Sequence, residues 1–259
     1  MLVIGEKINV ISRKIGAAMK AKDPKPIQEL AIAQANAGAN MLDVNIGPAT
    51  KGGPELMEWL VKTIQEVVDV PLSLDTTNPK AVEAGLKVHK GQALINSASG
   101  QKERLESMLP LAKKYDAKII GLTMTEKGIP RDANERASIA VDIITAMAEY
   151  EVHLENLYLD PLLLPIGVAQ QQTMEAIEAV RLFKQLHDPP LKTVVGLSNI
   201  SNGVPAQVKP ILDRTLLAML MTVGLDAAIL DPLDEELMKT LKTAQVFRNE
   251  ILYCHSYLD

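Results

Sequence analysis

Residues 71–100 read "PLSLDTTNPKAVEAGLKVHKGQALINSASG", and this stretch decides the fold class. Two short apolar runs, "PLSLDT" and "ALINSAS", stand on either side of an amphipathic stretch. That stretch opens with Asn78 as a helix cap and Pro79 in the first turn, and it stops at Gly91. Short and nearly continuous apolar runs are typical of parallel strands that helices cover. The stretch therefore predicts a strand, a helix and a second strand parallel to the first.

The same alternation continues in both directions from this stretch. Apolar runs of β character occur at residues 2–9, 41–45, 71–76, 93–99, 118–124, 157–161, 193–199 and 227–232. Amphipathic helical patterns occur at residues 24–38, 54–68, 78–91, 102–116, 132–150, 173–187, 206–224 and 234–255.

Eight strand–helix units match the size of a (β/α)8 (TIM) barrel, which takes about 250 residues. No linker rich in proline, glycine or serine separates two halves, so we expect a single domain over residues 1–259. A doubly wound open sheet is the alternative fold, but its GxGxxG dinucleotide fingerprint is absent.

The composition excludes several classes of protein. A net charge of −5 gives no general attraction to nucleic acid or to an anionic membrane. The single cysteine, Cys254, rules out an intramolecular disulfide and CxxC metal sites, and we expect a partly buried thiol there. Glu6 and Lys7 come too early for a signal peptide, and no apolar run reaches the roughly 18 residues that cross a bilayer. We therefore expect a cytoplasmic protein that binds neither nucleic acid nor membrane.

Polar residues follow the predicted strands, at the end where TIM barrels carry out their chemistry. They are Asn9, Asp43, Asn45, Asp75, Asn96, Thr123, Asp160, Ser198, Asn199 and Asp231. A single Asp or Asn after a strand is commonly a turn or cap residue.

Four of these residues resist that interpretation. Asp75 is followed by Thr77 and Asn78, which are better placed to cap the helix. Asn96, Asp160 and Asn199 lie several residues before the next helical pattern, which begins at about Gln171 after Asp160 and at about Ala206 after Asn199. None of the four histidines follows a strand, so we predict solvated or helix-face histidines and no metal site.

A ring of carboxylates and amides without lysine or arginine disfavours a phosphate as the main feature of the ligand. It suits a flat, neutral heterocycle with N–H donors and carbonyl acceptors. A pterin is such a molecule, because one carboxylate can accept from both its 2-amino group and its ring N3–H.

The motifs "GEKIN", "ANMLDVNIGP", "SLDTTNPKAVEAGL", "INSASG", "GLTM", "LDPLLLP", "GLSNIS" and "GLDAAILDP" occur in order along the chain. Together they resemble the pterin-binding methyltransferases, and most closely the methyltetrahydrofolate:corrinoid (iron–sulfur) protein methyltransferases and their relatives in corrinoid-dependent demethylation. The resemblance covers essentially the whole chain. It implies a TIM-barrel homodimer without a metal of its own, acting on tetrahydrofolate or 5-methyltetrahydrofolate. The cobalamin would be carried by a partner, a corrinoid protein such as the corrinoid iron–sulfur protein.

The resemblance also implies roles for particular residues. Asp75, Asn96 and Asp160 would hold the pterin ring. Asn199 would be the catalytic residue and hydrogen-bond near N5, the atom that carries the methyl group, while Gly196 and Ser198 shape the same wall. Asn202 follows in the "NISNG" loop, where close relatives carry a larger amide.

An amide near N5 suits methyl transfer, because N5 is a poor leaving group unless positive charge can develop on it. The ring offers no obvious strong acid, so we expect the proton to arrive through water or the asparagine network. Two alternatives remain at this point: a dihydropteroate synthase-like enzyme and a non-catalytic folate-binding protein. The folate domain of cobalamin-dependent methionine synthase is disfavoured, because this chain lacks the thiols of the zinc site that binds homocysteine. The direction of methyl transfer is open as well.

Overall fold

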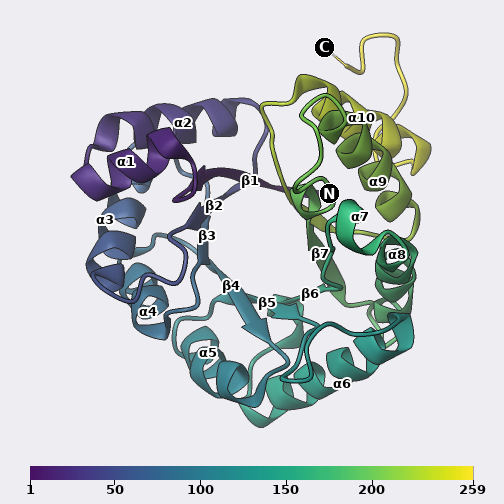
Figure 1. Cartoon of the computed structure of the whole chain (residues 1–259), viewed down its shortest axis with the longest axis horizontal. Helices are drawn as coiled ribbons and strands as arrows, with labels where there is room; N and C mark the ends of the chain where they lie inside the picture. Colours follow the sequence, from purple (N-terminus) through teal and green to yellow (C-terminus); the bar gives the residue numbers. More distant parts are fainter. Residues whose placement is uncertain (259) are drawn as a thin grey trace.

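The computed structural model describes residues 1–258, which form a closed barrel of eight parallel strands surrounded by helices (Figure 1). Each strand pairs with the next, and β8 closes the barrel by pairing with β1. The strands are β1 (Leu2–Asn9), β2 (Met41–Asn45), β3 (Leu72–Asp75), β4 (Leu94–Ser99), β5 (Lys118–Leu122), β6 (Leu157–Asp160), β7 (Lys192–Gly196) and β8 (Ala227–Leu230). The predicted (β/α)8 barrel is therefore confirmed.

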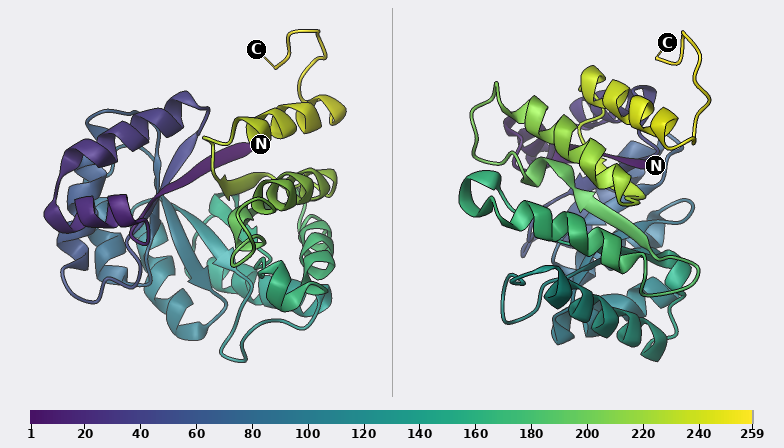
Figure 2. Two further views of the ribbon diagram at one scale, coloured as in Figure 1. Left: turned by 45° about the horizontal axis from the view of Figure 1, so that its top comes forward. Right: turned by 90° about the vertical axis from the view of Figure 1, so that its right-hand side faces the viewer.

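The helices form the outer layer in all three views (Figures 1 and 2). They are α1 (Arg13–Ala21), α2 (Pro24–Asn36), α3 (Gly53–Gln65), α4 (Pro79–Val88), α5 (Lys102–Lys114), α6 (Ala133–Glu149), α7 (Ile166–Ala169), α8 (Gln172–Phe183), α9 (Lys209–Thr222) and α10 (Glu235–Phe247). Two short 3-10 helices, η1 (Leu154–Asn156) and η2 (Leu197–Asn199), precede β6 and follow β7. Among residues 1–258, no helix is long and apolar enough to cross a membrane.

The apolar residues of the strands divide between two cores. One core fills the barrel interior with side chains from nearly all the strands, among them Ile4, Met41 and Tyr158. The larger core lies between the strands and the helices, where Ile8, Leu42 and many other apolar side chains are buried. Because both faces of the strands are covered, their sequences are apolar without alternation, as parallel strands require.

The local signals of the deciding stretch act as predicted. The side chain of Asn78 accepts hydrogen bonds from the backbone amides of Lys80 and Ala81, at 3.0 and 3.4 Å. Pro79 occupies the first position of α4, where the missing amide hydrogen costs nothing. The helix ends at Val88, three residues before Gly91.

Helix α1 was not predicted from the sequence. It is short and begins after the cap residue Ser12. Gly16 passes so close to the end of β1 that a Cβ atom built there would lie 2.3 Å from the carbonyl oxygen of Val10. A glycine is therefore required where α1 folds back against the end of β1, and a helical pattern of nine residues is too short to predict this turn.

Other boundaries also differ from the sequence prediction. Helix α10 ends at Phe247 rather than near His255, since Asn249 adopts a left-handed conformation with φ of 58°. Cys254 consequently lies beyond the helix and is exposed, so the expectation of a partly buried thiol was wrong. The short helix α7 occupies part of the segment expected to be irregular after Asp160. Asn96 lies inside β4 rather than at its end, because the strand continues to Ser99.

Candidate functional site

The polar residues of the strands meet in one hollow of about 250 Å³ at the carboxyl end of the barrel, which we call the central hollow. All eight strands contribute to it directly or through the residues that follow them. Its lining residues are Glu6, Asn9, Asp43, Asn45, Asp75, Asn96, Ser97, Leu122, Asp160, Leu162, Gly196, Ser198, Asn199 and Ile229. Of the residues with a predicted role in binding or catalysis, only Asn202 lies elsewhere, on the wall of an adjoining hollow.

Two β-bulges direct side chains into the central hollow. In β1, two residues, Glu6 and Lys7, stand opposite the single residue Asp43 of β2. In β4, Asn96 and Ser97 stand opposite the single residue Ile120 of β5. An extra residue bends a strand and turns a side chain that would otherwise point away, which is why bulges recur beside functional sites. The bulges shift the alternation, so that Asn9 as well as Glu6, and Ser97 as well as Asn96, line the hollow.

The carboxylates of Asp43 and Asp75 form a coupled pair on one wall. The Ser73 hydroxyl and the Asn96 amide donate to Asp43 Oδ1 at 2.6 and 3.0 Å, and the Asn45 amide donates to Asp75. Burial raises the pKa of both carboxyls, and the charge of Asp43 raises that of Asp75 further. The pair therefore holds a proton near neutral pH, with Asp75 as the protonated partner.

Asp160 stands across the hollow at the end of β6. Its carboxylate accepts a hydrogen bond from the Leu162 amide at 2.7 Å, and its carbonyl accepts one from the Thr123 hydroxyl at 2.9 Å. Burial raises the pKa of Asp160 to about 7, although the Leu162 amide and the charge of Arg136 oppose the rise. Arg136 is itself buried and donates to the carbonyl of Pro161 at 2.7 Å, which fixes the backbone behind Asp160.

Asn199 ends η2, the single turn that follows β7. Its side chain is exposed at the hollow and makes no hydrogen bond within residues 1–258. It caps no helix, because α9 begins ten residues later with Val208 at its cap position. A Cβ atom at Gly196 would lie 3.1 Å from Asn199 Nδ2, so the glycine leaves room for the amide. The amide is therefore free to bind a ligand.

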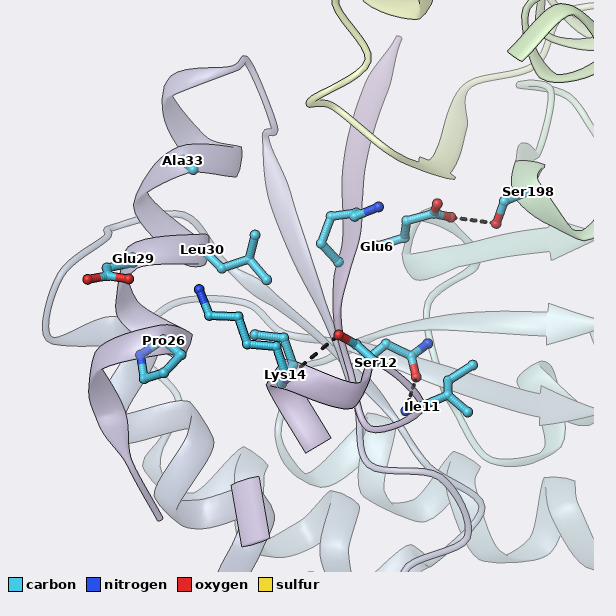
Figure 3. A pocket seen from close by; sticks show the side chains of 12 residues that line it. Glu6, Ile11, Ser12, Lys14, Pro26, Glu29, Leu30, Ala33 and Ser198 are labelled. Carbon is cyan, nitrogen blue, oxygen red and sulfur yellow. Dashed lines mark hydrogen bonds between the residues drawn. The ribbon is translucent and has the colours of Figure 1, made fainter. Parts of the chain in front are cut away.

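Glu6 is a residue of the site that the sequence pattern did not reveal. Its carboxylate accepts a hydrogen bond from the Ser198 hydroxyl at 2.7 Å (Figure 3). Burial raises the pKa of Glu6 from 4.5 to about 7, against the effect of that hydrogen bond. The structure thus adds to the ring an acid that the sequence analysis did not include. The motif "GEKIN" contained the signal, since Glu6 stands two residues after the interior residue Ile4, but Glu6 lies within the strand and not after it, where the candidates were sought.

A cation lies closer to the ring than the sequence suggested. The Lys7 ammonium is 2.7 Å from Asp231 Oδ2, and both residues line hollows beside the central one. Its charge is thus largely neutralised by Asp231. Among the described residues, no lysine or arginine lines the central hollow itself.

Comparison with known proteins agrees with this geometry. The model of the pterin-binding enzyme family matches residues 5–231. The chain belongs to this family. It is 26% identical over 259 residues to the methylcorrinoid:tetrahydrofolate methyltransferase of Eubacterium limosum, covering 99% of this chain and 94% of that protein.

Other relatives of this pterin-binding enzyme match it less completely or only in fold. The methionine synthase of Mycobacterium tuberculosis is 30% identical over 240 residues, which are 88% of this chain but 20% of that protein. The dihydropteroate synthase of Xanthomonas albilineans has a TM-score of 0.69 at 15% identity, covering 96% of this chain and 92% of that one. That of Thermus thermophilus has a TM-score of 0.68 at 18% identity, covering 96% and 92%. The two solved structures share the fold.

Within residues 1–258 of the pterin-binding enzyme, no group of three histidine, cysteine or acidic side chains is placed to hold a metal ion. His89 instead supports the fold, because its Nε2 accepts a hydrogen bond from the Leu72 amide at 2.9 Å, where β3 begins. The central hollow thus offers acids, amides and two hydroxyls as its chemical groups. These groups can bind a polar heterocycle and can exchange protons with it near neutral pH.

Proposed function

We propose that the protein is a methyltransferase that moves a methyl group between N5 of tetrahydrofolate and the cobalt of a corrinoid carried by a partner protein. The observation that carries this proposal is the free amide of Asn199, which faces a hollow lined by buried carboxylates and no cation. The family match and the methylcorrinoid:tetrahydrofolate methyltransferase of Eubacterium limosum, similar over nearly its whole length, support the same activity.

Asp160, Asp75 and Asn96 bind the pterin ring in this proposal. Asp160 accepts from the 2-amino group and the ring N3–H with the carboxylate lone pairs that the Leu162 amide leaves free. Asn96 and the protonated Asp75 provide donors for the ring nitrogens and the carbonyl. Gly196 and Ser198 line the wall beside Asn199.

Asn199 acts on N5 in the transition state. When methyl leaves N5 for Co(I), the C–N electron pair stays on N5 and the methyl–cobalt bond forms with the electron pair of cobalt. N5 must gain a proton in place of the methyl group, so positive charge at N5 assists departure. Asn199 can donate a hydrogen bond to the electron pair that the departing methyl group leaves on N5. Because this hydrogen bond is stronger in the transition state than in the bound substrate, it lowers the barrier to transfer.

Glu6 supplies the proton in this mechanism. It lines the same hollow as Asn199, and its carboxyl is about half protonated near pH 7. A carboxyl with a pKa near the working pH is the best compromise between holding a proton and releasing it. Ser198 can orient Glu6 and, by rotation of its hydroxyl, carry a proton between Glu6 and the ligand.

A dihydropteroate synthase is the second candidate, because its solved structures share this fold. That reaction expels pyrophosphate, which needs cationic groups. The residue pair after β7 is Ser198–Asn199, followed by Ile200, where dihydropteroate synthases carry a serine–arginine–lysine signature. The absence of lysine and arginine among the described lining residues of the central hollow favours methyl transfer.

Single-turnover kinetics test the proposal. The protein is mixed with 5-methyltetrahydrofolate and Co(I) cobalamin, and the loss of Co(I) absorbance is followed by stopped flow. We expect formation of methylcobalamin at a rate that depends on the protein, and formation of 5-methyltetrahydrofolate in the reverse mixture. Folate binding without transfer in either direction would identify a folate-binding protein instead. Formation of dihydropteroate from its precursors would favour the synthase.

The nature of the partner belongs to the proposal as well. A corrinoid iron–sulfur protein would receive the methyl group from folate, whereas a methyl-corrinoid protein of a demethylation system would donate it. Comparison of the two as substrates, at equal cobalamin concentration, distinguishes these directions. The homodimer and the cytoplasmic location stay predictions, and sedimentation of the purified protein tests the first.

A further inference from the structure

Arg136 is a charged side chain that the proposed mechanism does not use. It lies on α6, and none of its surface is exposed. Its Nε donates to the Pro161 carbonyl at 2.7 Å, and its Nη2 donates to Gln172 Oε1 at 2.8 Å. Its Nη1 is buried and has no hydrogen-bond partner within residues 1–258. Because a guanidinium stays protonated at physiological pH, a positive charge lies beneath the surface at this place.

The acids around Arg136 do not neutralise this charge by direct pairing. Four carboxylates act on it from a distance: Asp132, Glu135, Glu175 and Asp160. Glu135 pairs with Arg131 at 3.2 Å, and Glu175 accepts from the first backbone amide of α6 at 2.8 Å. In the described part of the chain, none of the four forms an ion pair with Arg136. A buried charge without such a partner is costly, and a neutral amide could supply the hydrogen bond to Pro161, so the charge itself calls for a function.

The turn that follows β6 lies against Arg136. Arg136 holds the carbonyl of Pro161, the residue after Asp160. Leu162 has a φ of 64°, a left-handed conformation that leucine rarely adopts, and its amide donates to Asp160 Oδ1. The turn is therefore held on one side by the Asp160 carboxylate and on the other by Arg136. The same arginine lowers the pKa of Asp160 against the effect of burial.

The central hollow has a use for a positive charge behind one of its acids. Burial raises the pKa of all four of its carboxyl groups, which are Glu6, Asp43, Asp75 and Asp160. Only an ionised carboxylate can accept from both donors of a pterin edge, because a protonated carboxyl presents a donor of its own. The charge behind β6 favours Asp160 as the ionised acid.

We propose that Arg136 is a positioning residue for pterin binding, which holds the Asp160 turn in place and makes Asp160 the carboxylate that accepts the pterin edge. This inference rests on the proposed function, because it takes a pterin as the ligand. Gln172 completes the arrangement, since its amide accepts from Arg136 and donates to the Arg131 carbonyl at 2.8 Å. An amide leaves the charge of Arg136 in force, whereas a glutamate in its place would cancel it.

Variants at two positions separate the charge of Arg136 from its hydrogen bonds. Gln172→Glu puts a carboxylate against Arg136 and leaves the arginine bonded to Pro161. Gln172→Met, the matched control, loses the same amide contacts without adding a charge. Arg136→Met removes the charge, and Arg136→Lys keeps it. Arg181→Met, at an exposed arginine of α8, controls for the change in net charge.

The first measurement needs no ligand. NMR of the carboxyl carbons in aspartate-labelled protein follows the titration of Asp160 from pH 4 to pH 9, and Asp160→Asn identifies its signal. Gln172→Glu and Arg136→Met should move the midpoint upward by about one pH unit or more, because a nearby positive charge favours the ionised form. Arg136→Lys should move it less, and Gln172→Met and Arg181→Met should leave it in place. An unmoved midpoint in Gln172→Glu would overturn the proposal.

The second measurement is the affinity for tetrahydrofolate over the same pH range. Because the other three acids of the hollow titrate there too, each variant is compared with the wild-type protein at each pH. Gln172→Glu should bind about five- to tenfold more weakly between pH 6 and 7 and nearly normally at pH 9, where Asp160 is ionised in both proteins. Arg136→Met should keep a further loss at pH 9, since it also releases the Pro161 carbonyl.

A loss of affinity that is equal at every pH would reveal a structural role only and overturn the proposal. If Arg136→Met does not fold, as judged by circular dichroism, Gln172→Glu decides the result, because it leaves Arg136 in place. A wild-type protein that binds no tetrahydrofolate would overturn the proposed function and the role of Arg136 in pterin binding together. Normal folate binding with an unmoved titration of Asp160 in Gln172→Glu would overturn the role of Arg136 alone.

Discussion

Replacement of Glu6 by glutamine should stabilise the protein at alkaline pH while it slows methyl transfer. The folded protein holds the Glu6 pKa near 7, well above its usual 4.5. A carboxyl with a raised pKa contributes its full stability below the unfolded value and loses it as the pH rises through the folded value. Between about pH 4.5 and 7 the wild-type protein therefore loses stability, because Glu6 is ionised in the unfolded chain and has to take up a proton on folding.

The size of the effect follows from the pKa values. The difference between 4.5 and about 7 corresponds to about 3 kcal/mol, at about 1.4 kcal/mol for each pKa unit. Glutamine keeps an oxygen that can accept from the Ser198 hydroxyl but never ionises, so Glu6→Gln escapes this loss. For a domain of this length the gain should raise the melting temperature by about 5–10 °C at pH 8 relative to the wild-type protein. At pH 4 the two proteins should differ little.

Thermal melting of the ligand-free proteins at intervals from pH 4 to pH 9 measures this difference. Glu103→Gln, at an exposed carboxylate on α5 outside the hollows at the mouth of the barrel, controls for the change of one unit in net charge. The same preparations are then assayed for single-turnover methyl transfer. Glu6→Gln should be slower at every pH, because glutamine has no acidic proton to donate to N5. A melting difference that stays constant from pH 4 to pH 9 would refute the raised pKa and with it the role of Glu6 as proton donor.

Three other predictions address the rest of the site. Asp160→Ala should weaken tetrahydrofolate binding by roughly 1.5–3 kcal/mol in a titration, because the two-donor pterin edge loses a charged acceptor; unchanged affinity with a normal circular dichroism spectrum would contradict the assignment. Asn199→Ala should slow transfer about 10²–10³-fold in both directions with a smaller loss of folate affinity, whereas Asn202→Ala, outside the central hollow, should change the rate much less; equal losses in rate, binding and melting temperature would leave Asn199 as a brace of its loop. Exhaustive treatment of this protein with a chelator, before the corrinoid is added, should leave methyl transfer at its full rate. A loss of activity that only added zinc restores would reveal a metal site.

The sequence predicted those features that depend on local pattern. Asn78 and Pro79 set the start of α4 by contacts within one turn, and the apolar strands indicate a sheet covered on both faces. With the order of parallel strands fixed, the residues that follow them had to meet at one end of the barrel. That is why the sequence alone was enough to predict that Asp75, Asp160 and Asn199 lie together.

The missed features depend on contacts between distant segments. The bulge in β1 that brings Asn9 into the hollow beside Glu6 exists only when β1 is paired with β2, and no residue pattern marks it. The sequence did not predict a cation beside the site. Lys7 is held there by Asp231, which lies 224 residues away in the chain. The near-neutral pKa values of Glu6 and Asp160 arise from burial, which a list of residues does not contain.

The closure of the barrel by β1 and β8 ties the assembly of the site to the order of synthesis. Glu6 is made before the other seven strands, but its own strand gains one of its two neighbours only when residues 227–230 have been made. Until then β1 and β7 each have an unpaired edge. Nothing in the sheet then holds β7 beside β1, so the hydrogen bond from Ser198 to Glu6 is not fixed. A nascent chain that ends after Asn199 therefore contains most residues of the central hollow but lacks Ile229 and the strand that joins β7 to β1. The last strand to be synthesised, β8, therefore completes the site, because it pairs with both β1 and β7.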